Sequence, residues 1–329
     1  MNKQIYFIIR LNIEEEISME LIVQFLLLIL GFIMLVKGAD WFVDGAAGIA
    51  EKFGIPQLVI GLTIVAMGTS APEAAVSITA ATKGNADITI GNVVGSNIMN
   101  VLVILGITSV IVAIAVADST VKYEIPYMLF VSILLLVFGY TGNAISFIEG
   151  VLLWAAFIVY LVYLFIMAKN NKEESPEEEK KKPVWLLIIL VVIGVVLIVK
   201  GSDVAVAAAT AIAKAAHLSE RFIGLTIVAL GTSLPELVTS VTAARRGKAD
   251  IAIGNIVGSN MFNILFVTGT TALITPVPFA ENFIVDAIIS IAAGVLLWIC
   301  VLKNHKLSRV GGIIMLVGYV GYFTYLMIQ

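Results

Sequence analysis

The chain has 329 residues, of which 60% are hydrophobic and 13% are charged, and its mean hydropathy is +1.04. Water-soluble domains of ordinary composition are far less apolar, so we expect a membrane protein. The formal net charge of −3 indicates no class of partner, because the charged residues are distributed unequally among the loops. The single cysteine, Cys300, excludes an intrachain disulfide and argues against metal-thiolate chemistry.

In chain order, the hydrophobic pattern predicts an all-α membrane protein with ten transmembrane helices. Each apolar run reaches the length of about 20 residues that a helix needs to cross a bilayer, and none alternates like a barrel strand. The expected spans are residues 20–50, 56–83, 88–117, 125–141, 145–168, 184–216, 222–246, 251–275, 283–302 and 309–328.

Residues 1–20 are expected to form an N-terminal extension. They make a poor signal peptide, because acidic residues follow the short apolar stretch and no small-residue cleavage site is present. The first clean span begins at Leu21, so Met19 is an alternative start.

The distribution of basic residues predicts the orientation. If the spans cross in turn, one side holds 13 of the 20 Lys and Arg residues, and this side should be the cytoplasm. Both termini would then lie outside the cell (inner) membrane, with the loop at 169–183 inside.

The sequence is an internal duplication. At an offset of 163 residues, 61–107 matches 224–270 at 29 of 47 positions without a gap. The two halves are expected to be 21–168 and 184–329, and the charged stretch between them, 169–183, lacks apolar residues and is expected to be a linker.

Five spans per half is an odd number, so the second copy enters the membrane from the opposite face and the repeats are inverted. Secondary transporters often have this architecture, with the ion site at the midplane between the copies. A duplication that served folding alone is the alternative.

Two glutamates, Glu73 and Glu236, lie near the middle of apolar spans. They end the motifs GTSAPE at 68–73 and GTSLPE at 231–236. A charge at such a depth costs at least about 2.5–3.5 kcal/mol unless it is compensated. Lys and Arg occur only at the ends of these spans, so the compensating charge is expected to be a proton or a dissolved cation. The alternative is a permanently protonated glutamate that hydrogen-bonds between helices.

The residues before each glutamate add further oxygens. Pro72 and Pro235 have no N–H, so the carbonyls of Gly68 and Gly231 lose their helical partners and can face an ion. Hydroxyls four and three residues before each glutamate lie on the same turn. They belong to Thr69, Ser70, Thr232 and Ser233. Oxygen ligands with two carboxylates suit hard cations such as Ca²⁺ or Na⁺.

The third span of each half opens with a polar stripe. The motifs GNVVGSNIMN at 91–100 and GNIVGSNMFN at 254–263 repeat polar residues at intervals of four, on one helix face. Those expected to be ligands are Ser96, Asn100, Ser259 and Asn263. For the other asparagines a purely structural hydrogen bond between helices stays open; these are Asn92, Asn97, Asn255 and Asn260. Glycines four apart open both motifs and permit close helix approach.

The first span of each half contains one Lys and one Asp that are three residues apart and can neutralise each other. They are Lys37 with Asp40 and Lys200 with Asp203. With Asp44, they are interpreted as structural or gating residues near the membrane surface. Asp87 and Asp250 are expected to cap or begin spans three and eight.

The paired GTSxPE and GNxVGSN motifs resemble the alpha repeats of the calcium/cation antiporter superfamily, specifically the prokaryotic sodium/calcium exchangers. The resemblance covers the chain from Leu21 onward, with the alpha motifs at 61–107 and 224–270. It implies ten helices and a site between helices two, three, seven and eight. It also implies alternating access, in which helices one and six slide across the other eight.

The resemblance also implies the ligands. The calcium site would comprise Glu73, Glu236 and the backbone carbonyls of Thr69 and Thr232. One side would bind sodium through Ala66, Ser70 and Ser96 with Glu236, and the other through Ala229, Ser233 and Ser259 with Glu73. Asn100 and Asn263 would line the middle. Potassium-dependent exchangers have Asp where this chain has Asn263, which argues against potassium dependence.

These observations predict a secondary active antiporter that exports Ca²⁺ by letting Na⁺ in. Lipid surrounds it, and no cofactor, nucleic acid or obligatory protein partner is expected. A proton/calcium exchanger on the same scaffold and a passive cation channel are the alternatives. An intramembrane enzyme is not expected, because the two histidines, His217 and His305, both lie near loops.

Overall fold

The computed structural model describes residues 3–86, 88–171, 182–216 and 229–328, and these are almost entirely helical. The first half comprises α1 (Lys3–Phe53), α2 (Gln57–Ile60), η1 (Gly61–Val65), α3 (Ala66–Thr69), α4 (Ala71–Thr82), α5 (Ile88–Met99), η2 (Asn100–Leu105), α6 (Gly106–Ile111), β1 (Ile114–Ala115), η3 (Thr120–Glu124), α7 (Ile125–Gly142), β2 (Ala144–Ile145) and α8 (Phe147–Asn170). The second half comprises α9 (Val184–Ala215), α11 (Ala229–Thr232), α12 (Leu234–Arg245), α13 (Ala249–Phe262), η6 (Asn263–Thr268), α14 (Gly269–Ile274), β3 (Val277–Pro278), α15 (Asn282–Leu302), β4 (Lys306–Leu307) and α16 (Arg309–Ile328). Segments labelled η are π-helical.

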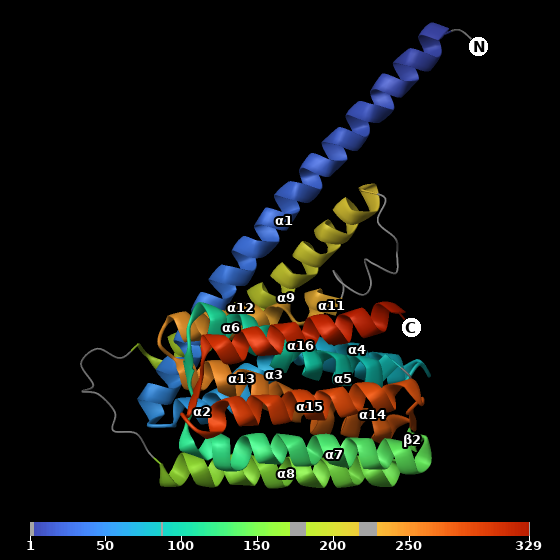
Figure 1. Cartoon of the computed structure of the whole chain (residues 1–329). Helices are drawn as coiled ribbons and strands as arrows, with labels where there is room; N and C mark the ends of the chain where they lie inside the picture. The colour runs from blue at the N-terminus through green and yellow to red at the C-terminus, as the bar shows by residue number, and fades with distance from the viewer. Residues whose placement is uncertain (1–2, 87, 172–181, 217–228, 329) are drawn as a thin grey trace.

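The helices form a layered body with two long helices leaning away from it (Figure 1). The helices α1 and α9 lie side by side and run obliquely to the rest, while α16, α15, α7 and α8 lie roughly parallel in successive layers. In the middle, α13 continues through η6 into α14, and its apolar and polar side chains are almost all buried. The outer helices expose large apolar side chains, as expected of a surface that contacts lipid.

Eight of the described helices are long and apolar enough to cross a membrane, and the bent segment Gln57–Thr82 adds a ninth. Their ends agree with the expected spans to within several residues. The expected span 222–246 begins outside the described residues, and its described part consists of α11 and α12. The number of ten spans therefore stays a prediction.

The second span is broken where the GTSAPE motif lies. The helix ends at Thr69, Ser70 has φ −85° and ψ 8°, and a new helix starts at Ala71 after a bend of 50°. Pro72 lies in the first turn of α4, where its missing N–H does no harm. In the second half, Ser233 has φ −94° and ψ 3° between α11 and α12. Both halves therefore have a helix break just before the proline, where the sequence predicted only a carbonyl without its helical partner.

Two very short antiparallel sheets join the halves. In one, Ile114 of β1 pairs with Leu307 of β4, and in the other, Ile145 of β2 pairs with Val277 of β3. Each sheet therefore takes one strand from either half of the chain.

Glycines allow α1 and α9 to pack with their backbones in contact. A Cβ placed at Gly38 would lie 2.9 Å from the carbonyl oxygen of Gly194, and one at Gly194 would lie 2.6 Å from the nitrogen of Phe42. The same closeness recurs one heptad further on, where a Cβ at Gly201 would lie 2.8 Å from the nitrogen of Leu35. A seam of this kind has few protruding side chains to oppose movement along it.

Candidate ion-binding site

Glu73 and Glu236 occupy matching places, in the first turns of α4 and α12 directly after the helix breaks. Each helix has 12 residues, and the positive end of its dipole favours a negative charge in the first turn. Each glutamate is only 1% exposed. The breaks thus place two acidic side chains deep inside the protein at helix N-termini.

The two helix breaks bring the two motifs into contact. Ser70, at the first break, donates a hydrogen bond of 2.8 Å to Oε1 of Glu236. The predicted meeting of the two motifs is therefore present, and it is made by a serine of one half and a glutamate of the other.

Several buried oxygens of the expected ligands have no hydrogen-bond partner. These atoms are Oε2 of Glu73, Oε2 of Glu236, Oδ1 of Asn100, Oδ1 of Asn263 and Oγ of Ser233. Buried polar atoms are normally paired, because leaving one unpaired costs about 1–3 kcal/mol. Five unpaired oxygens among the expected ligands, two of them from acids, form a donor set that a hard cation would satisfy.

The amide groups of four asparagines explain why two of these oxygens are left over. Asn100 donates through Nδ2 to Oδ1 of Asn260 at 2.9 Å, and Asn263 donates through Nδ2 to Oδ1 of Asn97 at 3.2 Å. Asn97 and Asn260 in turn donate to each other's backbone carbonyls at 3.3 Å. The network fixes both Asn100 and Asn263 by their nitrogens. Their oxygens are left without a partner.

Asn92 and Asn255 hold the glutamate helices in the same way in both halves. Asn92 donates to the backbone carbonyl of Glu73 at 3.1 Å and to Ser77, and Asn255 donates to the carbonyl of Glu236 at 3.4 Å and to Ser240. The alternative considered for these asparagines, a hydrogen bond between helices, is the role that the structure gives them.

The asparagines that begin π-helical segments are the innermost ones. The segment η2 begins at Asn100 and η6 begins at Asn263. Single π-turns inside α-helices occur frequently at functional sites, because they shift the register of side chains around the axis. Here η6 packs against α4, which carries Glu73, and η2 packs against α12, which carries Glu236.

The remaining expected ligands lie on the same elements. Thr69 donates to Oδ1 of Asn255 at 2.9 Å, and Ser259 donates to the carbonyl of Ala66 at 3.4 Å. Ser96 and Thr232 line a cavity of about 180 Å³ between α5, α11 and α16. Ala229 begins α11. Ten of the twelve expected ligands therefore belong to α3, α4, α5, η2 and their counterparts, and the other two, Ser70 and Ser233, lie at the helix breaks.

The charge pairs differ from the expectation in one half. Lys200 pairs with Asp203 at 3.4 Å, as predicted. Asp40 instead pairs with Arg246 at 2.7 Å, and the same guanidinium also contacts Asp44. The expected Lys37–Asp40 pair is therefore wrong, because a planar guanidinium between two carboxylates outcompetes a flexible lysine on the same helix.

Arg246 was not among the candidate residues, although it lies opposite Lys83 in the duplication. Nearby, Lys248 pairs with Glu51 at 2.7 Å, so two basic residues beside α12 hold the end of α1. Asp250 lies in the first turn of α13, as expected. Asp87, expected to begin the third span, and His217 lie outside the described residues.

An oxygen-lined, acidic cluster buried among apolar spans defines a membrane transporter of cations. The chain belongs to the sodium/calcium exchanger protein family, which matches it twice, at residues 23–166 and 186–328. Members of this family are antiporters with membrane-spanning helices and not enzymes.

The similar proteins include a putative antiporter and proteins named as sodium/calcium exchangers. The putative antiporter CaxA of Alkalimonas amylolytica is 38% identical over 316 residues, which cover 92% of this chain and 98% of that protein. The sodium/calcium exchanger MaX1 of Methanosarcina acetivorans is 37% identical over 344 residues, with the same shares covered. A solved structure of the sodium-calcium exchanger NCX_Mj, soaked without Na⁺ and Ca²⁺, superposes with a TM-score of 0.80 at 34% identity and covers 93% of this chain and 99% of that one.

Proposed function

We propose that this protein exchanges Na⁺ for Ca²⁺ across a cell (inner) membrane by alternating access, with Ca²⁺ export driven by Na⁺ entry. The proposal includes ten helices in two inverted repeats, 21–168 and 184–329, joined by a cytoplasmic linker at 169–183, with both termini outside. The ions would bind at the twelve expected ligands, centred on Glu73 and Glu236.

The unpaired oxygens are the observation that carries the proposal. Glu73, Glu236, Asn100 and Asn263 each have a buried oxygen without a partner, they belong to elements that pack against one another, and the described residues offer no ion pair to either acid. Oxygen ligands with two negative charges match Ca²⁺ in charge and hardness, whereas Zn²⁺ and Cu prefer nitrogen or sulfur. Ca²⁺ and Na⁺ are the substrates that would occupy this region in turn.

The matching contacts support inverted repeats. The pairs Asn100–Asn260 and Asn263–Asn97 exchange under the offset of 163 residues, and so do the contacts of Asn92 and Asn255. The two strand pairs also exchange as elements, because the offset carries β1 onto β3 and, with a shift of one residue, β4 onto β2. Contacts that interchange when the halves are swapped are those of an approximate twofold axis, which inverted repeats place in the membrane plane.

Exchange rather than channel conduction follows from the charge of the site. An empty site carries two buried acids, and moving these past apolar walls is costly. A site filled by Ca²⁺ or by Na⁺ is closer to neutral and can change sides. Because both ions need the same two glutamates, one leaves before the other binds, and their movements are coupled.

The names of the relatives support the choice of ions. MaX1 is called a sodium/calcium exchanger, and NCX_Mj a sodium-calcium exchanger. Asn263, where potassium-dependent exchangers have Asp, supports a site that does not need K⁺.

Radioactive Ca²⁺ uptake into proteoliposomes loaded with Na⁺ tests the proposal. We expect uptake that requires internal Na⁺ and falls at least about a hundredfold in Glu73→Gln or Glu236→Gln, since each removes half of the charge that binds Ca²⁺. Asp286→Asn is the matched control, because Asp286 is also a carboxyl within a span but accepts from Tyr322 on α16.

Three results would point elsewhere. Unchanged uptake in the glutamine variants would refute the site. Uptake that ignores Na⁺ but collapses with a pH gradient would replace Na⁺ by H⁺ on the same scaffold. Flux that needs no counter-ion and does not saturate would indicate a channel.

A further inference from the structure

The hydroxyl of Ser202, on α9, contacts the backbone beside the second helix break. It donates a hydrogen bond of 2.6 Å to the carbonyl oxygen of Gly231 in α11. Ser202 is only 6% exposed, and Gly231 is buried as well. The bond therefore links one of the two long oblique helices to the GTSLPE motif inside the protein.

The carbonyl of Gly231 is the one that Pro235 leaves without a helical partner. Proline has no N–H to donate to the residue four positions before it, and α11 ends at Thr232, just before the break at Ser233. The sequence left this oxygen open for an ion, whereas in the structure Ser202 donates to it. Because a peptide group is planar, holding the Gly231 carbonyl also holds the nitrogen of Thr232, whose own carbonyl is an expected calcium ligand.

The duplication does not repeat this arrangement in the first half. The offset of 163 residues carries Ser202 to Ala39 and Gly231 to Gly68. The helix α1 therefore has a methyl group where α9 has a hydroxyl. Gly68 packs closely against an aromatic ring of α1, because a Cβ placed at Gly68 would lie 2.9 Å from Cζ of Phe42.

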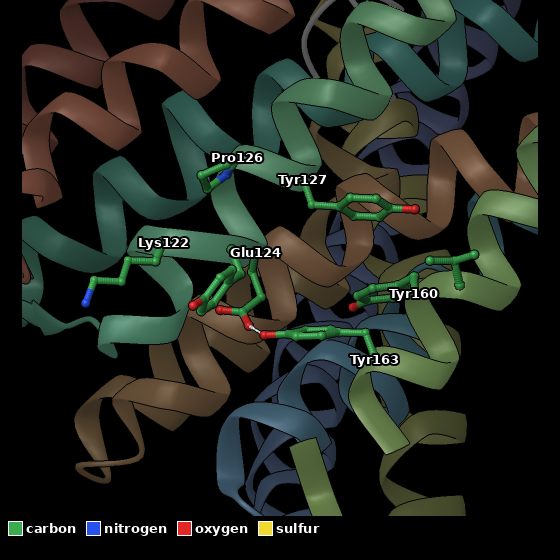
Figure 2. A pocket seen from close by; sticks show the side chains of 8 residues that line it. Lys122, Glu124, Pro126, Tyr127, Tyr160 and Tyr163 are labelled. Carbon is green, nitrogen blue, oxygen red and sulfur yellow. Dashed lines mark hydrogen bonds between the residues drawn. The ribbon is translucent and has the colours of Figure 1, made fainter. Parts of the chain in front are cut away.

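The first broken span has a polar contact with a different helix. Tyr160 of α8 donates to the carbonyl of Leu62 in η1 at 2.9 Å, and Figure 2 shows this tyrosine beside Tyr127 and Tyr163. The counterpart of Tyr160 in the duplication is Phe323, which has no hydroxyl. These two hydrogen bonds therefore tie the first broken span to α8, in the layered body, and the second broken span to α9.

Movement of α9 would break the bond between Ser202 and Gly231. The proposed alternating access slides α1 and α9 together across the other helices. Helix shifts in switching proteins are about 1–2 Å or one turn of about 5.4 Å. An O–H···O hydrogen bond spans about 2.5–3.0 Å, so two oxygens 2.6 Å apart leave this range when such a shift separates them.

We propose that Ser202 is a positioning residue of the ion site that acts in one conformation only. It holds the peptide group between Gly231 and Thr232 while α9 has the position seen here, and it releases this group when α9 slides. The inference rests on the proposed alternating access. Because α1 has Ala39 at the matching place, the opposite conformation lacks an equivalent bond, and the conformation seen here is favoured.

The approximate twofold axis gives a second variant whose effect has the same sign. Inverted repeats are related by an axis in the membrane plane, so the opposite conformation follows when the two halves exchange their arrangements. In that conformation Ala39→Ser would supply the hydroxyl that Gly68 lacks. In the conformation seen here, Ala39 is 0% exposed within an apolar cluster, where an added hydroxyl is unfavourable.

Distances between two spin labels measure the populations of the two conformations. The labels are attached to the full-length Cys300→Ser protein at Trp185→Cys on α9 and at Lys303→Cys after α15, both of which replace exposed residues. Pulsed electron spin resonance in lipid nanodiscs, with Na⁺, with Ca²⁺ and with neither, gives the population of each distance.

We expect two distances in the otherwise unchanged protein, one of them the distance in this structure. Ser202→Ala should lower the population of that distance relative to the other about 2–10-fold, the contribution of one buried hydrogen bond. Ala39→Ser should shift the ratio in the same direction. Ser132→Ala is the matched control and should leave the ratio unchanged, because this buried serine of α7 bonds to the Met128 carbonyl of its own helix.

The outcomes separate this inference from the proposed function. Two distances with an equal ratio in Ser202→Ala would refute the role of Ser202 alone, and so would a shift of the same size in Ser132→Ala. An unchanged ratio in Ala39→Ser would refute the symmetric part of the inference. A single distance under all three ion conditions would refute the sliding of α9, on which both proposals rest.

Discussion

Ser70 donates its hydroxyl to Oε1 of Glu236, a residue 166 positions away. The hydroxyl comes from the break in the first half and the carboxyl from the first turn after the break in the second half. Each half therefore contributes one partner to a buried hydrogen bond between the two motifs.

Replacing Ser70 should therefore affect sodium more than calcium. Ser70→Ala removes an oxygen expected to bind Na⁺ and frees Glu236, and a hydrogen bond to a charged group contributes about 1.5–3 kcal/mol. We expect the sodium concentration for half-maximal exchange to rise about tenfold, with a change in that for calcium of about threefold at most. Ser132→Ala is the control, because this buried serine bonds to the Met128 carbonyl of its own helix. Equal shifts for both ions would contradict the assignment.

The four-asparagine network predicts equal costs in the two halves. Asn97→Ala leaves the amide of Asn263 without its acceptor, and Asn260→Ala does the same to Asn100. Each unpaired buried amide should lower stability by about 1–3 kcal/mol and weaken calcium binding. Thermal unfolding in detergent and calcium titration would measure both effects, with the exposed Asn171→Ala as control. A large loss of stability in one variant and none in the other would show that symmetric hydrogen bonds contribute unequally to stability.

The close glycine contacts between α1 and α9 predict that a larger residue there slows transport but leaves calcium binding intact. In Gly194→Ala the new methyl group would lie 2.6 Å from the Phe42 nitrogen, so the helices must move apart. We expect exchange to slow at least about tenfold while equilibrium calcium binding stays within about threefold. Gly321→Ala, where nothing lies within 4 Å of the new Cβ, should transport normally. Normal exchange in both variants would mean that α1 and α9 do not need this close contact.

The Arg246 contacts predict a restraint on α1. Arg246→Gln removes the ion pairs to Asp40 and Asp44. Ala47, on the same helix as these two residues, is only 4% exposed. In a Cys300→Ser background, a thiol introduced by Ala47→Cys should react several times faster once Arg246 is replaced, as expected for an ion pair worth about 1 kcal/mol. Lys306→Gln, on an exposed lysine, is the control. An unchanged labelling rate would show that the ion pairs do not hold this end of α1 closed.

The sequence was sufficient for most of the spans but did not predict the breaks. Hydrophobic runs located the helices because the lipid-facing and buried sides are both apolar. Pro72 indicated only that a carbonyl would lose its helical partner, and the structure places this proline in the first turn after the bend. The cost of a charge in an apolar span drew attention to Glu73 and Glu236, and both are buried in the structure.

Contacts between distant residues were harder to predict. Asp40 has a lysine three residues away, and local spacing favoured that pair over Arg246, which is 206 residues away in sequence. The reciprocal bonds of Asn97 and Asn260 depend on how α5 and α13 cross, which no local pattern specifies. The π-helical start at Asn100 has no sequence signature that we could identify.

The two short sheets join the halves of the chain by backbone hydrogen bonds. Ile114 of the first half pairs with Leu307 of the second, and Ile145 pairs with Val277. Two polypeptides made by cutting the chain after Asn170 should therefore co-purify. Before the duplication, a homodimer of the single-copy protein would form the same two strand pairs, with one strand of each pair from each subunit.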